Sequence, residues 1–336
     1  MTTSQLPAHE RSTGRKTAWS DRLRRFLPEI VVTLLLVLAF VAGSLLSPYF
    51  LDEQFLFKQA ILYIEIGILA LGLTFVIISG NLDLSVASNL AMVACVTAYL
   101  HAKLGVSFEL CLVIGLLLGA LGGALNGYLI AWLRLPSLTV TLATLALYRG
   151  VAQILLGDHS IQDMPKWFFG VDRYIIAGTL IPASFVLFLL LAVVFGLVLH
   201  KTVLGRYIYA IGTNERAAFY AGVPVKRIKL LIFTLAGLLA GFAALMLNSR
   251  LMVARYDHAR GWELDAITAV VLGGTSIAGG RGTIYGTVVA LLLIGVLRTA
   301  MGVANVKVEA QLTVVGALLI IAVILSDLAG RRRRKV

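Results

Sequence analysis

Charged residues are scarce in this chain of 336 residues, where Asp, Glu, Lys and Arg together account for only 14%. Hydrophobic residues make up 59%, and the mean hydropathy is +0.92. This balance excludes an ordinary soluble protein. No polar stretch is long enough to enclose a second core, so a separate soluble domain is excluded as well. The apolar runs instead reach the roughly 20 residues that a helix needs to cross a bilayer.

The usual catalytic and metal-binding groups are scarce too. Cys95 and Cys111 lie in apolar runs and fit no metal or disulfide spacing, and none of the five His belongs to an HExxH pattern. The sequence contains no G-x-S-x-G elbow and no G-x-x-x-x-G-K-[ST] phosphate loop. The glycine-rich run 273–282 lacks the Lys and the preceding strand of such a loop. We therefore predict no enzyme, no cofactor and no metal site, and energy for any transport must come from another protein.

Long hydrophobic runs are what the sequence has in abundance. They predict an all-α polytopic membrane protein with one membrane domain at 29–328, between basic tails at 1–28 and 329–336. The polar N-terminal segment is too long for a typical cleaved signal, so we expect the first span to be retained. About ten transmembrane helices are expected, at 29–47, 55–79, 85–101, 108–131, 138–156, 180–199, 229–248, 264–280, 284–302 and 309–327.

The net charge of +12 is concentrated before the first apolar run, after the last one and in the loop 200–229. The positive-inside rule places these segments, and both termini, in the cytoplasm. Anionic lipid then accounts for the basic tails better than nucleic acid does. Two loops, 157–179 and 249–263, fall on the external side. Their charged residues fit either shallow loops with local ion pairs or a docking surface for a partner, with Asp158, Asp163, Arg255 and Glu263 as candidates.

Glycine follows two patterns. Gly115, Gly119, Gly123 and Gly127 recur every fourth residue, a ridge that lets helix backbones pack closely in a membrane. A second group crowds the end of the eighth expected span and should interrupt its helix: Gly273, Gly274, Gly279, Gly280 and Gly282. Segments 115–131 and 237–253 also share weak similarity, which either an inverted repeat or chance explains.

Polar residues inside apolar spans are the candidates for a transport path or its gate, because each is costly in lipid unless paired or wetted. They are Glu65, Asn81, Asp83, Asn89, Asn126, Thr141, Thr144, Arg149 and Asp265. Structural explanations stay open. The threonine hydroxyls can bond to their own helix, Asp83 can cap the helix that follows it, and Glu65 can pair with Arg149.

The loop 200–229 is the longest basic interruption between apolar runs, with six Lys or Arg and one Glu. It contains the heptad Arg216-Ala217-Ala218-Phe219-Tyr220-Ala221-Gly222. Taken alone, such a loop is either a solvated connector or a docking surface.

Four blocks in order, within residues 30–328, resemble the permease subunits of bacterial ABC importers for monosaccharides, the ribose, xylose, galactose, autoinducer-2 and rhamnose group. The first is Gly80-Asn81-Leu82-Asp83-Leu84-Ser85-Val86, with Ala87 where the family usually has Gly. The second is Thr141-Leu142-Ala143-Thr144-Leu145 with Tyr148-Arg149-Gly150. The third runs from Gly205-Arg206-Tyr207 through Gly212 and Asn214 to Gly222. The fourth is Gly261-Trp262-Glu263-Leu264-Asp265 with the glycine run to Thr283.

The resemblance implies a type II importer-like fold and a cytoplasmic coupling loop that docks on an ATPase subunit. The family pattern E-A-A-x-x-x-G has Arg216 in place of the leading Glu, and neighbouring Glu215 is the candidate for that contact. The implied coupling residues are Gly205, Arg206, Gly212, Asn214, Glu215, Arg216, Ala217, Ala218 and Gly222. Further implied partners are a second permease subunit and an external sugar-binding protein, which would dock on the external loops.

The expected function is therefore passage of a monosaccharide through a bacterial inner-membrane importer, with a pentose or a deoxyhexose such as rhamnose as the candidate sugars. One alternative is an ion-coupled secondary transporter that uses Glu65, Asp83 or Asp265. Others are a permease for nucleosides or branched-chain amino acids and a membrane-embedded enzyme, which the missing catalytic groups disfavour.

Overall fold

The computed structural model describes residues 27–47, 50–170, 176, 179–318 and 320–321. Within those ranges the chain is helical and contains no strand, only an isolated β-bridge between Ile161 and Ala254. The predicted all-α class is confirmed. Most of the two basic tails, residues 1–26 and 329–336, lies outside the described residues.

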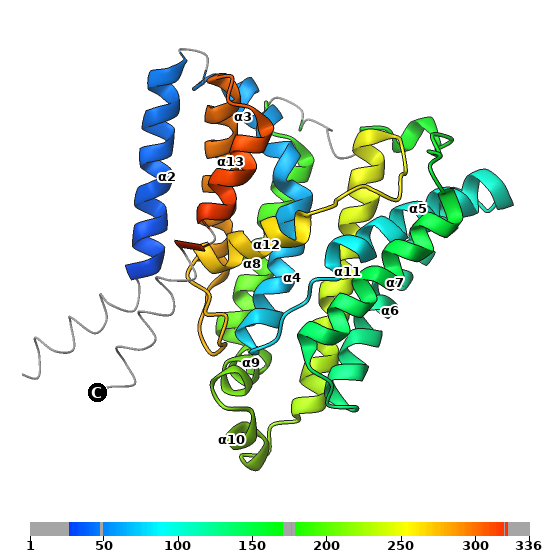
Figure 1. Cartoon of the computed structure of the whole chain (residues 1–336), viewed down its shortest axis with the longest axis vertical. Helices are drawn as coiled ribbons and strands as arrows, with labels where there is room; N and C mark the ends of the chain where they lie inside the picture. Colours follow the sequence, from blue (N-terminus) through cyan, green and yellow to red (C-terminus); the bar gives the residue numbers. More distant parts are fainter. Residues whose placement is uncertain (1–26, 48–49, 171–175, 177–178, 319, 322–336) are drawn as a thin grey trace, which may run out of the picture.

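Fourteen elements follow one another in the described part of the chain, and Figure 1 labels the α-helices among them. They are α2 (Leu27–Leu46), α3 (Glu53–Ala60), η1 (Ile61–Tyr63), α4 (Ile64–Ile78), α5 (Val86–Leu104), α6 (Phe108–Ala131), α7 (Ser137–Leu156), η2 (Lys166–Phe168), α8 (Ala183–Lys201), α9 (Val203–Thr213), α10 (Glu215–Tyr220), α11 (Val225–Leu251), α12 (Trp262–Leu272) and α13 (Ile284–Val303). A further short apolar helix occupies Val308–Leu318.

The expected number of membrane helices was too high. Seven helical segments of the described chain are long and apolar enough to span a membrane, against the ten expected. The expected span 85–101 is α5, a helix that carries Ser88, Asn89 and Thr97 and lies among α6, α7 and α11. The expected span 264–280 is reduced to the 11-residue α12. The last one, 309–327, is helical over Val308–Leu318 and lies partly outside the described residues.

The glycines account for the short α12. The helix ends at Leu272, and Gly274 and Gly279 then adopt φ values of +91° and +83°, which L-residues with side chains rarely adopt. The predicted interruption of this helix is confirmed. Short helices and irregular backbone in a membrane protein must be covered by other protein segments or line a cavity.

Helix α4 is the centre of the bundle, because all of its 15 residues are buried. It packs against α8, α11, α12 and α13, while α2 lies at the periphery beside α13 (Figure 1). A predominantly apolar helix that other helices enclose is typical of a membrane-protein interior. In Figure 1, α9 and α10 form the lower end of the molecule and α3 lies at the upper end.

The glycine ridge on α6 packs against α11. A Cβ atom built on Gly119 would lie 2.6 Å from the carbonyl oxygen of Gly237 and 2.8 Å from the Cα of Gly241. A Cβ atom built on Gly123 would likewise come within 2.9 Å of the backbone of both Phe233 and Gly237. The predicted packing role of the ridge is confirmed, and the partner is the helix that contains most of the weakly similar segment 237–253.

Replacing Gly123 by Ala should therefore destabilise the bundle. The added methyl would overlap the backbone of α11, and overpacking of this kind costs about 1–3 kcal/mol. The measurement is the midpoint of unfolding in mild detergent. Gly150→Ala on α7 is the matched control, since a Cβ there meets nothing within 4 Å. Equal midpoints for the two variants would contradict this account of the ridge.

Candidate coupling and transport site

The basic segment 200–229 folds into two short helices, and side chains cap both. The hydroxyl of Thr202 accepts a hydrogen bond from the amide of Gly205 at the start of α9. The Asn214 side chain accepts one from the amide of Ala217, 3.0 Å away, at the start of α10. Such caps satisfy amides that a helix leaves unpaired. One residue, Asn214, thus separates α9 from α10 and fixes the angle between them.

Helix α10 buries its small residue and exposes its large ones. Ala218 is buried, whereas Phe219 and Tyr220 are 64% and 85% exposed. Gly222 follows with φ of +83° and closes the turn by donating from its amide to the carbonyl of Phe219. Two exposed aromatic rings on a capped six-residue helix are typical of a surface that a partner covers. Sequence reasoning missed both rings, although they sit inside the heptad it singled out.

The remaining predicted coupling residues have different positions. Gly205 is buried, and a Cβ there would overlap the carbonyl of Leu199, so it allows α9 to fold back on α8. Arg206 and Arg216 are exposed. Glu215 bonds to the ammonium of Lys229 at 2.7 Å, with the lysine 9% and the glutamate 53% exposed. The carboxylate proposed for a partner contact therefore also ties α10 to α11.

Residues 79–85, between α4 and α5, form a non-helical break: a turn at Ser79 and Gly80 followed by irregular backbone that side chains hold in place. The hydroxyl of Ser137, at the start of α7, accepts a hydrogen bond from the amide of Leu82. The carboxylate of Asp83 accepts bonds from both the amide and the hydroxyl of Ser85, at 2.9 and 2.7 Å. The structural explanation, in which Asp83 stabilises the start of the next helix, agrees with this geometry. Buried backbone away from water needs such partners.

The predicted amides complete a network around this break. Asn126 on α6 donates to the hydroxyl of Ser85 at 2.8 Å, and Asn89 on α5 donates to the carbonyl of Gly119 at 3.0 Å. Asn81 donates to the Ser79 side chain at 2.9 Å. Each amide is at most 7% exposed. The side-chain oxygens of Asn89 and Asn126 have no partner among the described residues, so the network keeps acceptor capacity in its interior.

The two predicted threonines lie on the same side of α7 as this break. Thr141 donates to the carbonyl of Ser137 at 2.9 Å, and Thr144 donates to that of Val140 at 3.1 Å. Both are buried, at 0% and 4%. Their hydroxyls thus bond to their own helix, as the structural explanation expects. A role of these amides and threonines in a transport path stays a prediction.

The charged residues predicted for the path are tied into the fold. Glu65 pairs with Arg250 at 2.7 Å, with side chains 2% and 7% exposed, and not with Arg149. Asp265 pairs with Arg298, also at 2.7 Å. Arg149 donates instead to the backbone carbonyls of Tyr256 and His258 and so holds the loop after α11. The carboxylates of Glu65 and Asp265, which would be costly in lipid, are thus each paired with an arginine.

The two loops predicted to be external lie side by side. The bridge between Ile161 and Ala254 joins them through amide–carbonyl bonds of 3.2 and 2.9 Å, and Ser249 adds a bond to the carbonyl of Phe168. Asp158 and Asp163 are exposed on one loop and Arg255 on the other, while Glu263 is half-buried at the start of α12. Hydrogen bonds from Arg255 lower the pKa of Asp257. The two loops therefore contain a local ion pair and also present exposed charged residues on a common surface, so features of both interpretations are present.

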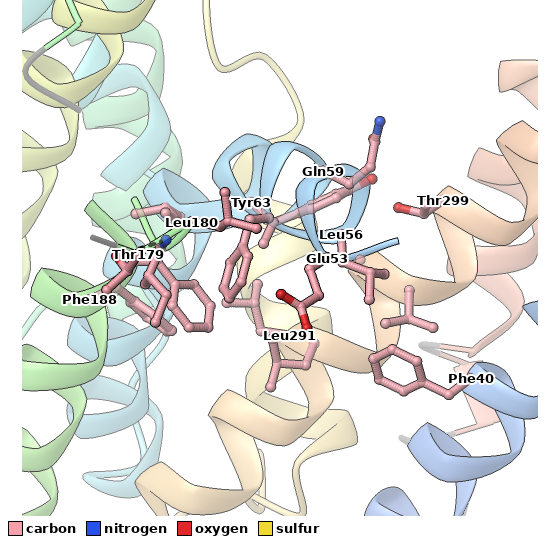
Figure 2. Close-up of a pocket in the computed structure, with 18 residues that line it drawn as sticks. Phe40, Glu53, Leu56, Gln59, Tyr63, Thr179, Leu180, Phe188, Leu291 and Thr299 are labelled. Carbon is pink, nitrogen blue, oxygen red and sulfur yellow. Dashed lines mark hydrogen bonds between the residues drawn. The ribbon is translucent and has the colours of Figure 1, made fainter. Parts of the chain in front are cut away.

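A cavity of about 1000 Å³ lies away from the polar network, among α2, α3, α8 and α13 (Figure 2). Apolar and aromatic side chains dominate its wall, including Phe40, Phe188 and Leu291. None of the predicted path residues lines it. A wall of this kind offers few hydrogen bonds to a polar solute.

Membrane-length helices around a polar break, with a capped helical platform at one end, define a multi-pass membrane transport protein. Residues 55–323 match the family described as branched-chain amino acid transport system / permease component, and the chain belongs to that family. It is 40% identical to the ribose import permease protein RbsC of Bacillus subtilis (strain 168), over 84% of this chain and 87% of RbsC. It is 37% identical to the autoinducer 2 import system permease protein LsrD of Escherichia coli (strain K12), over 88% and 91%. No solved structure matches the chain.

Proposed function

We propose that this chain is the permease subunit of an ATP-driven importer that receives a monosaccharide from an external binding protein. The observation that carries the proposal is α10, a capped helix that projects two aromatic rings from one end of the bundle. A transporter driven by an ion gradient needs no such platform. A separate ATPase subunit needs one, because ATP binding must be transmitted to the membrane helices.

The relatives support the direction and class of transport. Both are import permeases, one for ribose and one for autoinducer 2. The family description refers to branched-chain amino acids, but the relatives that match most of the chain favour a small sugar such as ribose. They lend support to the pentose expectation and none to rhamnose.

The proposed orientation places α10 in the bacterial cytoplasm and the joined external loops on the other side of the inner membrane. Basic residues of the segment 200–229 fit this arrangement by the positive-inside rule. The binding protein would then rest on the surface that carries Asp158, Asp163 and Arg255. A second permease subunit, identical or homologous, would complete the path.

The path itself we place at the polar network around residues 79–85. Its amides and hydroxyls are enclosed within the single chain, so they would reach the sugar when α5, α6 and α7 shift relative to one another. Uncharged hydrogen-bonding groups suit passage of a sugar, because they bind it without holding it tightly. Glu65 and Asp265, already paired with arginines, would support the walls.

The test is co-purification of partners in mild detergent together with uptake into proteoliposomes. We expect wild-type permease to retain an ATPase subunit and to import radiolabelled ribose only when ATP and the binding protein are present. Gly222→Arg should lose the ATPase, because it places a bulky residue at φ of +83° beside the exposed rings. A folded permease that retains no ATPase and takes up sugar until an ionophore is added would establish the ion-coupled alternative instead.

A further inference from the structure

Three backbone segments that are far apart in sequence meet at one point below α4 (Figure 1). They are the end of α4 at Ile78–Gly80, the end of α9 at Gly212, and the loop after α12 at Gly279–Gly280. We call this contact the glycine junction. The amide of Gly280 donates to the carbonyl of Ile78 at 2.8 Å, so two of the segments are hydrogen-bonded directly.

Only glycine permits so close an approach. A Cβ on Gly212 would overlap the carbonyl oxygen of Ile78 and lie 2.5 Å from the amide of Gly280. A Cβ on Gly279 would lie 2.8 Å from the Cα of Gly80 and 2.9 Å from the carbonyl oxygen of Gly212. The junction is therefore backbone against backbone, without the flexible side chains that elsewhere absorb small displacements.

Helix α9 holds the same loop at a second point. The hydroxyl of Tyr209 donates to the carbonyl of Gly282 at 2.6 Å. Tyr209 and Gly212 are three residues apart, so they lie on one face of α9. Two contacts on one face fix the orientation of α9 relative to the loop, where a single contact would let it pivot.

The three segments of the junction continue into different parts of the protein: α10, the break at residues 79–85, and α13. At one end, Asn214 alone separates α9 from α10, the helix with the exposed rings. At the other end, Gly80 begins the break that carries Asp83, and the loop continues into α13 at Ile284. Gly80, Gly279 and Gly280 have φ values of +79°, +83° and +75°, a backbone state that a side chain would strain.

We propose that the glycine junction transmits the displacement of α9 and α10 to the break between α4 and α5. This inference rests on the proposed function, since the displacement is that produced when an ATPase subunit on α10 binds ATP. Gly212 and Tyr209 are positioning residues: they contact neither the ATPase nor the sugar, and they act through the position of residues 79–85. Packed groups and hydrogen bonds can carry coupling of this kind between two sites, and the junction supplies both.

The test follows a reporter at the break and needs no substrate. Cys95 and Cys111, both free and buried, are replaced by Ala, and Leu84→Cys is introduced beside Asp83. The rate of maleimide labelling is measured for the permease–ATPase complex with and without a non-hydrolysable ATP analogue. In the reporter protein we expect the analogue to change the rate by about fivefold or more, in the range of measured coupling between sites. In Gly212→Ala the change should vanish, while the amount of bound ATPase stays the same.

Gly196→Ala on α8 is the matched control, because its Cβ would meet Ile284 at an ordinary 3.9 Å. It should keep the full response. If Gly212→Ala does not fold, Tyr209→Phe decides, since it removes one hydrogen bond and adds no atoms; we expect a reduced response with normal ATPase binding. A full response in the folded variant, loss of ATPase binding in Tyr209→Phe, or no response in the reporter protein would each overturn the proposal. Absence of ATPase from the wild-type complex would contradict the proposed function itself.

Discussion

Replacing both exposed rings of α10 by aspartate, Phe219→Asp with Tyr220→Asp, should abolish retention of the ATPase subunit. Truncating a hot-spot residue of an interface, a class in which aromatic residues are enriched, costs about 2 kcal/mol or more, and every 1.4 kcal/mol is tenfold in affinity. The double variant should therefore bind at least about 100-fold more weakly. The dissociation constant, measured with the purified ATPase in detergent, is the quantity to compare.

The fold should survive this change, because neither ring contributes to the core. The two side chains are 64% and 85% exposed, and they contact each other edge to face. Leu104→Asp, at the 61% exposed end of α5, is a matched control that adds a charge at a comparable position away from α10. Unchanged ATPase affinity in a folded double variant would show that α10 is not the contact.

Signals that are local in sequence predicted the corresponding parts of the fold well. The glycines at every fourth residue of α6 and the glycines that end α12 both have causes within a few residues. A cap, a positive φ or a helix period is set by neighbouring residues, so the sequence displays it directly.

The sequence could not predict which charged residues form ion pairs with one another. Glu65 lies 185 residues from Arg250, and Asp265 lies 33 from Arg298. Arg149 was an equally good partner for Glu65 on sequence grounds. Only the packing of α4 against α11 decides between them, and that packing depends on shape along whole helices.

The overestimate of membrane spans has a local cause, whereas the use of polar residues in the path depends on contacts across helices. Polar residues of α5, including Asn89 and Thr97, make it less apolar than the seven membrane-length helices, and the glycines after Leu272 limit α12 to 11 residues. Polar residues in spans, such as Asn89 and Asn126, stand out because they are costly in lipid. Their use, whether to hold the broken backbone or to face a solute, depends on contacts across helices.

The pair of Glu65 and Arg250 should make one of the largest single contributions to stability. Arg250→Met leaves a carboxylate that is 2% exposed without its cation, and breaking a buried pair in this way costs about 3–5 kcal/mol. The free energy of unfolding, measured with denaturant in one detergent, should fall by that amount. Arg255→Met, which removes an arginine from the exposed pair with Asp257, is the matched control and should have a much smaller effect.

The double variant Glu65→Gln with Arg250→Met separates the two sources of this cost. If the penalty comes from an uncompensated buried charge, neutralising Glu65 should restore part of the stability that Arg250→Met removes. If it comes from lost packing of the arginine stem, the double variant should be no more stable than the single one. An Arg250→Met protein as stable as Arg255→Met would contradict both explanations, and α4 would then be held at the centre of the bundle by its apolar contacts alone.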